Sequence, residues 1–368
     1  MDDIERITEE SEKQLRTERF SALMKEPLEK KISRSEGKVN EFVNILTLPE
    51  VYVSTSGGKD SAVLSDLCKK LYPDIQHVMF DTGLEYMETV NLAREQGAII
   101  IPPKTNCINF WKTKGYPAVS KQVSKRVHDA KVSCLGACIT MFSKVYHLSD
   151  KWLHLLECDI PISQKCCDKF KKEPSQKFAK SPIIGTRAEE SAMRKNAWKR
   201  SGCNTYSSNY KKGVSRPISL WTEKDVNQYV LDNNVRLSEL YTQYEQKRTG
   251  CVCCPYGAQL GGSRFDLLNS LEPKRYEHFM STPLRQILML TGVKIVSDPD
   301  YMMDMEAVQE KVSEWHEAVK GNDKYLTYKA KWLKSRYPKD EIISSVQHLA
   351  KKGKLLYPES EIMKCLKS

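Results

Sequence analysis

Short β-rich runs alternate with segments of helical spacing between residues 50 and 101. The runs 51–53, 75–80 and 98–101 are apolar, and a helical pattern of apolar residues follows each of the first two. Strands that alternate with helices in this way predict βαβ units, and a series of such units predicts a parallel sheet. We therefore expect an α/β fold in which helices flank a parallel twisted sheet.

The chain as a whole divides into three expected segments. Residues 1–47 have the mixed charge and scattered apolar residues of helices, with short interruptions at Pro27 and Gly37. Residues 48–264 hold the predicted sheet, and residues 265–368 are again dominated by helical spacing, which predicts helical extensions at both ends. No long linker or internal repeat separates the segments, so the sequence does not require a second independent domain.

Composition narrows the class of protein. The chain of 368 residues carries a formal net charge of +11, which favours polyanionic partners such as nucleotides or nucleic acid. The alternative is a basic surface that interacts only with solvent. No apolar run reaches the length of about 18 residues that a membrane span needs, and the acidic N-terminus lacks the apolar core of a secretory signal, so we expect a cytoplasmic protein without a membrane partner. In that compartment, twelve cysteines favour metal binding or redox chemistry over disulfides.

Residues 54–61, STSGGKDS, lie between the first predicted strand and its helix. Backbone N–H groups at a helix start bind anions, and glycines let the backbone approach the anion closely. The hydroxyl groups of Ser54, Ser56 and Ser61 add donors, and Lys59 adds positive charge. The loop lacks the Walker spacing because its two glycines are adjacent. Local chemistry thus predicts phosphate binding, with a simple glycine-serine turn as the alternative.

The SGGKDS motif resembles the PP-loop of the ATP pyrophosphatase superfamily. The resemblance implies an adenine nucleotide alpha hydrolase-like fold for residues 48–264 and, as in many members, cleavage of ATP between its α- and β-phosphates. It also implies that the loop binds pyrophosphate or the corresponding phosphate and sulfate groups. The loop residues implied in binding are Ser54, Ser56, Gly57, Gly58, Lys59, Asp60 and Ser61.

A second polar turn, Asp81-Thr82-Gly83, follows the second apolar run. Ligands of open α/β sheets bind beyond the carboxyl ends of the strands, where Asp81 could accept hydrogen bonds from adenine or ribose, or position a metal such as magnesium. The alternative is a turn that only caps the next helix. The stretch FDTGLEYMET, with Glu85 and Thr89 in helical register, is similar to an element of the phosphoadenosine phosphosulfate reductase branch. This resemblance implies that all three turn residues belong to the site.

The stretch SPIIGTRAEESAMR predicts another strand that ends in glycine before a helix. Arg187, at the carboxyl end of this strand, is placed to bind a phosphate or sulfate through two hydrogen bonds. The alternative is a surface ion pair of Arg187 with Glu189 or Glu190. The stretch resembles the family's G-x-R-x-x-x-S motif, which implies Gly185, Arg187 and Ser191 as binding residues.

Two cysteine pairs stand far apart in the chain: Cys166-Cys167, and the C-x-x-C of Cys251 and Cys254. Four thiolates suit zinc or an iron–sulfur cluster, although adjacent cysteines are strained ligands for a single tetrahedral zinc. Buried cysteines without a ligand are the alternative. The pattern resembles the CC…CxxC signature of assimilatory adenylyl-sulfate reductases, which implies that these four residues hold a 4Fe–4S cluster. Cys253 is an additional thiol that could replace one of them.

The resemblance covers residues 48–260, and two departures from the reductases bear on function. The lysine-containing loop looks like that of enzymes that use ATP itself, including sulfate adenylyltransferase subunits and DNA phosphorothioation sulfur-transfer enzymes. The chain also lacks the reductases' C-terminal E-C-G-L-H motif, although Cys365 lies in the corresponding region.

We therefore expect an enzyme that cleaves ATP to AMP and pyrophosphate and uses the cluster in sulfur transfer, with Lys59, Asp60 and Arg187 as catalytic residues. A nucleic-acid acceptor and a sulfur-donor protein are the expected partners, since the stretch 194–213 is basic. One alternative is an adenylyl-sulfate or phosphoadenosine phosphosulfate reductase, in which a thiolate attacks sulfur and sulfite is released. Another is a nucleotide- and cluster-binding subunit without turnover of its own.

Overall fold

The computed structural model describes residues 3–209, 211–246, 248–258, 264–321 and 325–367. The chain forms two compact units. The sheet unit comprises Met1–Lys104 and Phe170–Cys251, and the helical unit comprises Thr105–Lys169 and Val252–Ser368. Each unit is built from two separate stretches of chain, whereas the three segments expected from composition follow chain order.

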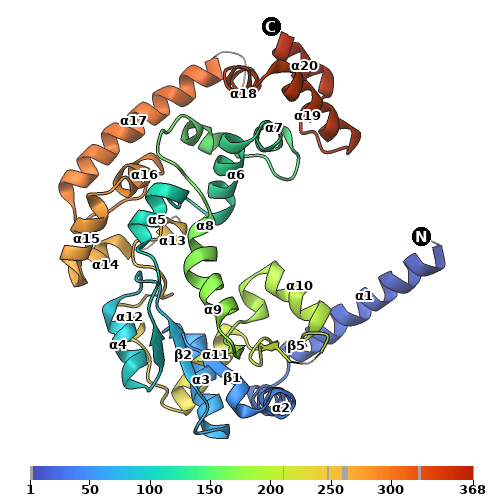
Figure 1. Cartoon of the computed structure of the whole chain (residues 1–368), viewed down its shortest axis with the longest axis vertical. Helices are drawn as coiled ribbons and strands as arrows, with labels where there is room; N and C mark the ends of the chain where they lie inside the picture. The colour runs from blue at the N-terminus through green and yellow to red at the C-terminus, as the bar shows by residue number, and fades with distance from the viewer. Residues whose placement is uncertain (1–2, 210, 247, 259–263, 322–324, 368) are drawn as a thin grey trace. The chain divides into compact units, whose positions relative to one another are not determined.

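Six strands among the described residues of the sheet unit form one sheet in the order β3-β2-β1-β4-β6-β5. Figure 1 labels β1, β2 and β5 of this sheet. The bounds of the six strands are Val51–Ser54 for β1, His77–Phe80 for β2, Ile99–Ile101 for β3, Ser181–Ile184 for β4, Asn204–Tyr206 for β5 and Gly213–Ser215 for β6. All neighbouring pairs in this sheet are parallel except β5 and β6, which are antiparallel. The predicted α/β fold is confirmed, and the β5–β6 pair is its departure from a wholly parallel sheet.

The central strand β1 and the helix after it share a hydrophobic core. Val51 and Val53 are fully buried and pack in one cluster with Val63 and Leu67 of α3 (Lys59–Leu71). Burial of this apolar face fixes α3 against the sheet. Its first turn is therefore held directly after the carboxyl end of β1.

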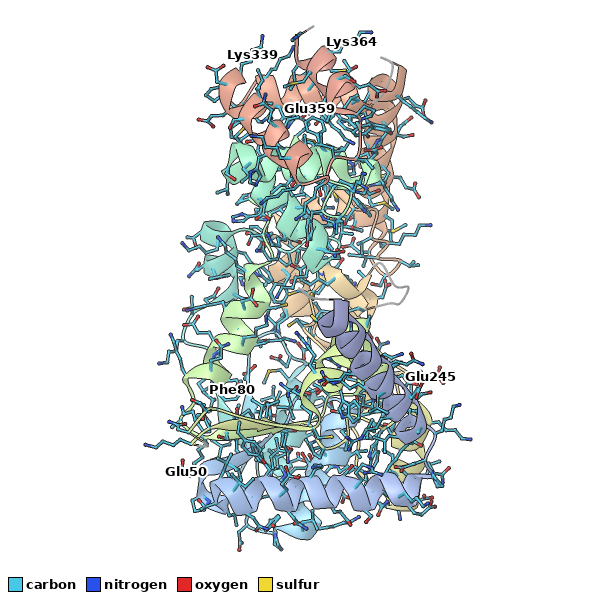
Figure 2. All side chains as sticks on the ribbon, turned by 90° about the vertical axis from the view of Figure 1, so that its right-hand side faces the viewer. Glu50, Phe80, Glu245, Lys339, Glu359 and Lys364 are labelled. Carbon is cyan, nitrogen blue, oxygen red and sulfur yellow. The ribbon has the colours of Figure 1, made fainter. Side chains whose placement is uncertain are left out.

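The opposite face of β1 carries an aromatic group. The Tyr52 ring meets Phe80 of β2, labelled in Figure 2, and Phe178 in edge-to-face contacts, with ring centroids 6.0 and 5.0 Å apart. The Tyr52 hydroxyl forms a hydrogen bond of 3.0 Å with Ser175. Both faces of the central strand are thus packed, which gives the strand ends a rigid support.

Helices complete the sheet unit. Besides α3, their bounds are Asp3–Met24 for α1, Leu28–Leu46 for α2, Met87–Glu95 for α4, Glu173–Lys177 for α9, Ala192–Ser201 for α10, Glu223–Asp232 for α11 and Glu239–Thr242 for α12. Helix α2 begins after Pro27, as expected, but it continues through Gly37, so the predicted interruption at Gly37 is wrong. Buried Val39 and Phe42 anchor α2 across this position, because tertiary packing outweighs the low helix propensity of one glycine. Helix α11 begins at Glu223, and Thr222 before it forms a full capping box with Asp225.

The helical unit contains the remaining helices. Their bounds are Cys107–Lys114 for α5, Lys121–Val132 for α6, Cys134–Phe142 for α7, Lys165–Cys167 for α8, Pro255–Ala258 for α13, Arg264–Leu271 for α14, Pro273–Met280 for α15, Leu284–Leu290 for α16, Pro299–Gly321 for α17, Tyr325–Lys334 for α18, Lys339–Lys351 for α19 and Glu359–Lys367 for α20. Figure 2 labels Lys339 and Glu359, the first residues of α19 and α20. Among the described residues, no helix combines the length and the apolar character that crossing a membrane requires.

Candidate functional site

A cavity of about 590 Å³ lies at the carboxyl ends of β1 and β4 in the sheet unit. Strands β2 and β3 lie on one side of β1, and β4 lies on the other, so the strand order reverses at this point. Open α/β sheets bind their ligands at such switch points. The residues that line the cavity are Ser54, Ser56, Gly58, Lys59, Asp60, Ser61, Lys171, Lys172, Ile184, Gly185, Thr186, Arg187, Glu190, Arg194, Glu223, Tyr241, Arg248 and Thr249.

Most of the predicted phosphate-binding residues line this cavity, but five do not. The five are Gly57, Asp81, Thr82, Gly83 and Ser191. Gly57 has a structural role in the loop, and Ser191 caps α10, where its hydroxyl accepts a hydrogen bond of 3.2 Å from the Arg194 N–H. The structure therefore brings together the loop and the Gly185–Arg187 stretch, and places the Asp81 turn outside the cavity wall.

The loop has a conformation that only glycine fits at residue 57. Gly57 has a φ of +72°, and a Cβ there would lie 1.9 Å from Thr89 Cγ2. The Ser61 hydroxyl accepts a hydrogen bond of 3.2 Å from the Ser56 N–H and donates one of 2.8 Å to the Gly58 carbonyl. These contacts hold the turn before α3, and the first residues of that helix, Lys59, Asp60 and Ser61, line the cavity. The start of a helix is where backbone N–H groups bind anions.

Lys59 supplies a positive charge at the start of α3. Its Nζ donates a hydrogen bond of 2.9 Å to Asn227 Oδ1 and lies 3.6 Å from a carboxylate oxygen of Glu223. The same Nζ lies 5.7 Å from the centre of the Tyr241 ring. The Lys59 ammonium group, which we predicted to bind phosphate, thus already contacts other side chains of the protein.

Asp60 and Arg187 form an ion pair at the cavity wall. The Arg187 Nε donates to Asp60 Oδ1 over 2.8 Å, and its Nη1 donates to Glu189 over 2.7 Å. Arg187 is only 8 % exposed. Burial raises the pKa of the Asp60 carboxyl above its usual value, and the Arg187 guanidinium opposes that shift. Arg187 thus lines the cavity and also pairs with a neighbouring glutamate, and its predicted role in phosphate binding stays a prediction.

Gly185 allows β4 and α3 to approach each other closely. A Cβ at this position would lie 2.8 Å from the backbone oxygen of Asp60. A side chain there would push the start of α3 away from β4. Close packing of β4 against α3 therefore requires a glycine at this position of the G-x-R motif, whether or not Gly185 contacts a ligand.

Four further basic residues line the cavity and were not predicted as individual site residues: Lys171, Lys172, Arg194 and Arg248. Burial, followed by the charge of Arg248, lowers the pKa of Arg194, which forms an ion pair with Glu190. Lys171 and Lys172 follow the Cys-Cys pair closely, and Arg248 precedes the C-x-x-C pair. Their position next to the cysteine motifs could have indicated these residues in the sequence. Only the fold, however, shows that they line one cavity. The basic stretch 194–213 was predicted as a whole, and its residue 210 lies outside the described residues.

The Asp81 turn forms a network of its own. Glu85 accepts hydrogen bonds from the N–H and the hydroxyl of Thr82, over 2.9 and 2.6 Å. Asp81 Oδ1 accepts one of 2.7 Å from the Gly83 N–H. Burial raises the pKa of the Glu85 carboxyl, and its hydrogen bond with Asp81 raises it further. The predicted roles of Asp81, Thr82 and Gly83 in ligand or magnesium binding stay predictions.

The four predicted cluster ligands belong to different units. Cys251 is the last residue of the sheet unit, where its Sγ lies 4.0 Å from the Thr82 hydroxyl. Cys166, Cys167 and Cys254 belong to the helical unit. There, the indole N–H of Trp111 donates to Cys166 Sγ over 3.2 Å. Hydrogen bonds to ligand sulfur atoms are common around thiolate-bound metal centres.

Tyr256 of α13 lies near three of the predicted ligands, Cys166, Cys167 and Cys254. The Tyr256 hydroxyl is buried and has no hydrogen-bond partner among the described residues. Ser124, which lies nearby, bonds instead to the Ala118 backbone. Burial raises the pKa of Tyr256, and the charges of the three cysteines raise it further.

A buried hydroxyl donor in the neighbourhood of these thiols suits a thiolate-bound cluster. The described residues nevertheless contain no group of three or more His, Cys, Asp or Glu placed to hold a metal ion. The 4Fe–4S cluster, with the ligand set predicted from the sequence, therefore stays a prediction.

Comparison with known proteins identifies the family. The sequence matches the model of the phosphoadenosine phosphosulfate reductase domain over residues 50–98 and 121–256, which is half of the chain. The chain belongs to this family. The matched residues include the glycine-serine loop, the Gly185–Arg187 stretch and both cysteine pairs of this family member.

Individual relatives are distant. An uncharacterized protein of Methanocaldococcus jannaschii is 22% identical over 257 residues, covering 66% of this chain and 52% of the relative, so the chain spans about half the length of that curated protein. Phosphoadenylyl-sulfate reductase from Candida auris, in a phosphate complex, is 16% identical, with 59% of this chain and 87% of that chain covered and a TM-score of 0.35. The U34-tRNA thiolase NcsA from Methanococcus maripaludis, with its [4Fe-4S] cluster, is 15% identical, with 69% and 80% covered and a TM-score of 0.30.

Proposed function

We propose that this member of the family is an enzyme that binds ATP in the cavity of the sheet unit and cleaves it to AMP and pyrophosphate. In this proposal, the activated acceptor then receives sulfur, with nucleic acid as the acceptor class. One observation carries the proposal: a phosphate loop and three arginines line one cavity at the switch point of the sheet.

The charges around the cavity support pyrophosphate as the leaving group. An acceptor oxygen would attack the α-phosphorus, the bond to the bridging oxygen would break, and pyrophosphate would leave with the bonding electron pair. Lys59 and the first N–H groups of α3 would stabilise the charge on that group. Arg187, held by Asp60 over 2.8 Å, would orient the α-phosphate. Hydrosulfide, or sulfide from a donor protein, would then displace AMP from the acceptor.

The predicted ligands Cys166, Cys167, Cys251 and Cys254 would hold the 4Fe–4S cluster. The cluster would supply redox and sulfur-binding chemistry to the reaction. Trp111 would stabilise the charge of the Cys166 thiolate through its N–H, which already points to that sulfur.

Exposed basic side chains support nucleic acid as the acceptor class. Lys195 and Arg200 lie exposed on α10, and Lys211 and Lys212 are exposed after β5. All four belong to the sheet unit that contains the cavity. Lysine and arginine side chains supply the salt-dependent part of nucleic-acid binding through contacts with phosphates.

Product analysis with anaerobically purified protein tests the proposal. ATP and adenylyl sulfate would be offered separately, each with and without tRNA or DNA, and pyrophosphate, AMP and sulfite would be measured. We expect AMP and pyrophosphate from ATP, with more product when the acceptor is present. Sulfite from adenylyl sulfate without pyrophosphate from ATP would instead identify a reductase. ATP binding without either product would identify a non-catalytic subunit.

A further inference from the structure

The Tyr241 hydroxyl lies at the phosphate loop and forms hydrogen bonds there. It accepts a hydrogen bond of 3.3 Å from the backbone N–H of Lys59, the first residue of α3. It also accepts one of 3.1 Å from the N–H of Thr249 and lies 3.3 Å from the Thr249 hydroxyl. A phenol oxygen has two acceptor sites and one proton, so these three contacts use its full hydrogen-bonding capacity.

The Lys59 N–H is one of the groups that a bound phosphate would use. It belongs to the first turn of a helix of 13 residues, where N–H groups have no partner within the helix. A phosphate oxygen is a stronger acceptor than a neutral phenol, because a charged acceptor forms shorter and stronger hydrogen bonds. An anion that enters the loop therefore competes with Tyr241 for this N–H.

Tyr241 also belongs to an anchored helix. Its helix α12 is fixed at the start, because Glu88 of α4 accepts hydrogen bonds from the Ser238 hydroxyl and the Glu239 N–H, over 2.6 and 2.9 Å. Thr249, in contrast, lies outside any helix or strand, as do Arg248 and Gly250. When the Tyr241 hydroxyl loses its hydrogen bonds, we therefore expect Thr249 to move rather than the start of α12.

The Thr249 stretch leads directly to a cysteine. Thr249 lies two residues before Cys251, a predicted cluster ligand, whose sulfur lies beside Thr82 within the sheet unit. The hydroxyl of Tyr241 therefore connects the phosphate loop to the backbone that positions Cys251.

We propose that Tyr241 is a positioning residue that couples occupancy of the phosphate loop to the position of the 249–251 stretch. Without an anion, Tyr241 ties this stretch to the loop and blocks the Lys59 N–H. Pyrophosphate, or the phosphates of a nucleotide, takes over that N–H and frees the stretch that carries Cys251. This inference rests on the proposed function, since it needs a phosphate-bearing ligand in the cavity.

The test compares the wild-type protein with Tyr241→Phe, which keeps the ring and removes the hydroxyl. The matched control is Tyr244→Phe, a neighbouring and more exposed tyrosine outside the cavity wall. Calorimetry would measure binding of inorganic pyrophosphate. We expect Tyr241→Phe to bind pyrophosphate about two- to tenfold more tightly, because no protein hydrogen bond must be broken first. The control should bind with wild-type affinity.

Hydrogen–deuterium exchange supplies the second measurement. Pyrophosphate should accelerate exchange of the backbone N–H groups at 249–251 in the wild-type protein, towards the rate in unliganded Tyr241→Phe. In Tyr241→Phe, pyrophosphate should protect the loop at 56–61 but leave 249–251 unchanged.

Three results would overturn the coupling. Weaker binding by Tyr241→Phe would make Tyr241 an ordinary contact of the ligand. If the wild-type protein binds pyrophosphate but exchange at 249–251 does not change, the coupling is absent and the proposed nucleotide binding still stands. If neither pyrophosphate nor ATP binds to the wild-type protein, the proposed function fails together with the coupling.

Discussion

At the scale of single residues, two predicted catalytic residues of the cavity, Lys59 and Arg187, already contact protein partners. Lys59 contacts Asn227 and Glu223, and Arg187 contacts Asp60 and Glu189. An anionic ligand must therefore exchange these partners for its own oxygen atoms. The net gain from each basic residue is smaller than its charge suggests, because the existing pair is lost.

Replacement of Lys59 by alanine should weaken pyrophosphate and ATP binding. A hydrogen bond to a charged group contributes about 1.5–3 kcal/mol, which corresponds to roughly a tenfold to hundredfold rise in Kd. Calorimetry checks this value. Lys70→Ala is the matched control, because Lys70 lies in the last turn of the same helix and pairs with Asp66 over 2.8 Å. Equal losses in both variants would contradict a specific role of Lys59.

The Glu85 carboxyl gives a pH dependence at the same scale. Burial, reinforced by the hydrogen bond with Asp81, raises its pKa in the folded protein. The folded state thus binds the proton more tightly than the unfolded chain. This stabilisation is fully present below the unfolded pKa and is lost as the pH rises through the folded pKa.

Glu85→Gln removes this titration and keeps an acceptor for the Thr82 N–H. We expect the free energy of unfolding of the wild-type protein, relative to the variant, to fall as the pH rises through the folded pKa of Glu85. Urea unfolding at a series of pH values measures this difference. The exposed Glu95 provides the control Glu95→Gln. A difference between wild type and Glu85→Gln that does not change with pH would show that the carboxyl has no raised pKa.

At the scale of secondary-structure elements, two glycines with different surroundings test how the helices are held. A Cβ at Gly37, within α2, would have no atom within 4 Å, whereas a Cβ at Gly185 would lie 2.8 Å from the Asp60 backbone. Gly37→Ala should therefore raise the free energy of unfolding by about 0.5–1 kcal/mol, because alanine is the better helix former.

Gly185→Ala should lower the free energy of unfolding and weaken pyrophosphate binding, because β4 and the start of α3 must separate. Urea unfolding and calorimetry on the two variants give the comparison. Tight binding by a stable Gly185→Ala protein would show that the contact between β4 and α3 is less strict than the geometry indicates.

The pattern of apolar residues in the sequence predicted the strands and helices better than it predicted which residues pack around them. Alternating apolar runs gave β1 to β4 and α3, because burial of those runs decides their structure. The predicted helix break at Gly37 was wrong. The prediction considered the glycine alone and not the packing of the apolar residues around it. Tyr241 and Arg248 carried no motif of their own, and they reach the phosphate loop only through the path of the folded chain.

At the scale of the whole molecule, the two compact units do not follow the order of the chain. Both units combine an early and a late stretch of the sequence, and the predicted ligand set takes Cys251 from one unit and three cysteines from the other. Spacing in the sequence predicted the cysteine pairs but not this division, because compact units are defined by long-range contacts. The indole contact to Cys166 and the buried Tyr256 hydroxyl were equally outside the reach of a motif.

Removal of one predicted ligand tests the cluster in the intact chain. Cys254→Ser should lose iron and the visible absorption of anaerobically purified protein, because serine is a poor ligand for iron in such clusters. Cys158→Ser is the matched control: Cys158 also belongs to the helical unit, and burial raises the pKa of its thiol, which disfavours metal binding. Iron analysis and absorption spectra on both variants give the readout.

Iron removal from the wild-type protein by a chelator should also lower its Tm, because a group bound only by the folded state stabilises that state. The Cys254→Ser protein should show the lower Tm already, with no further change on chelation. Full iron content in Cys254→Ser, or equal loss of iron in Cys158→Ser, would show that the cysteine pairs do not hold the cluster.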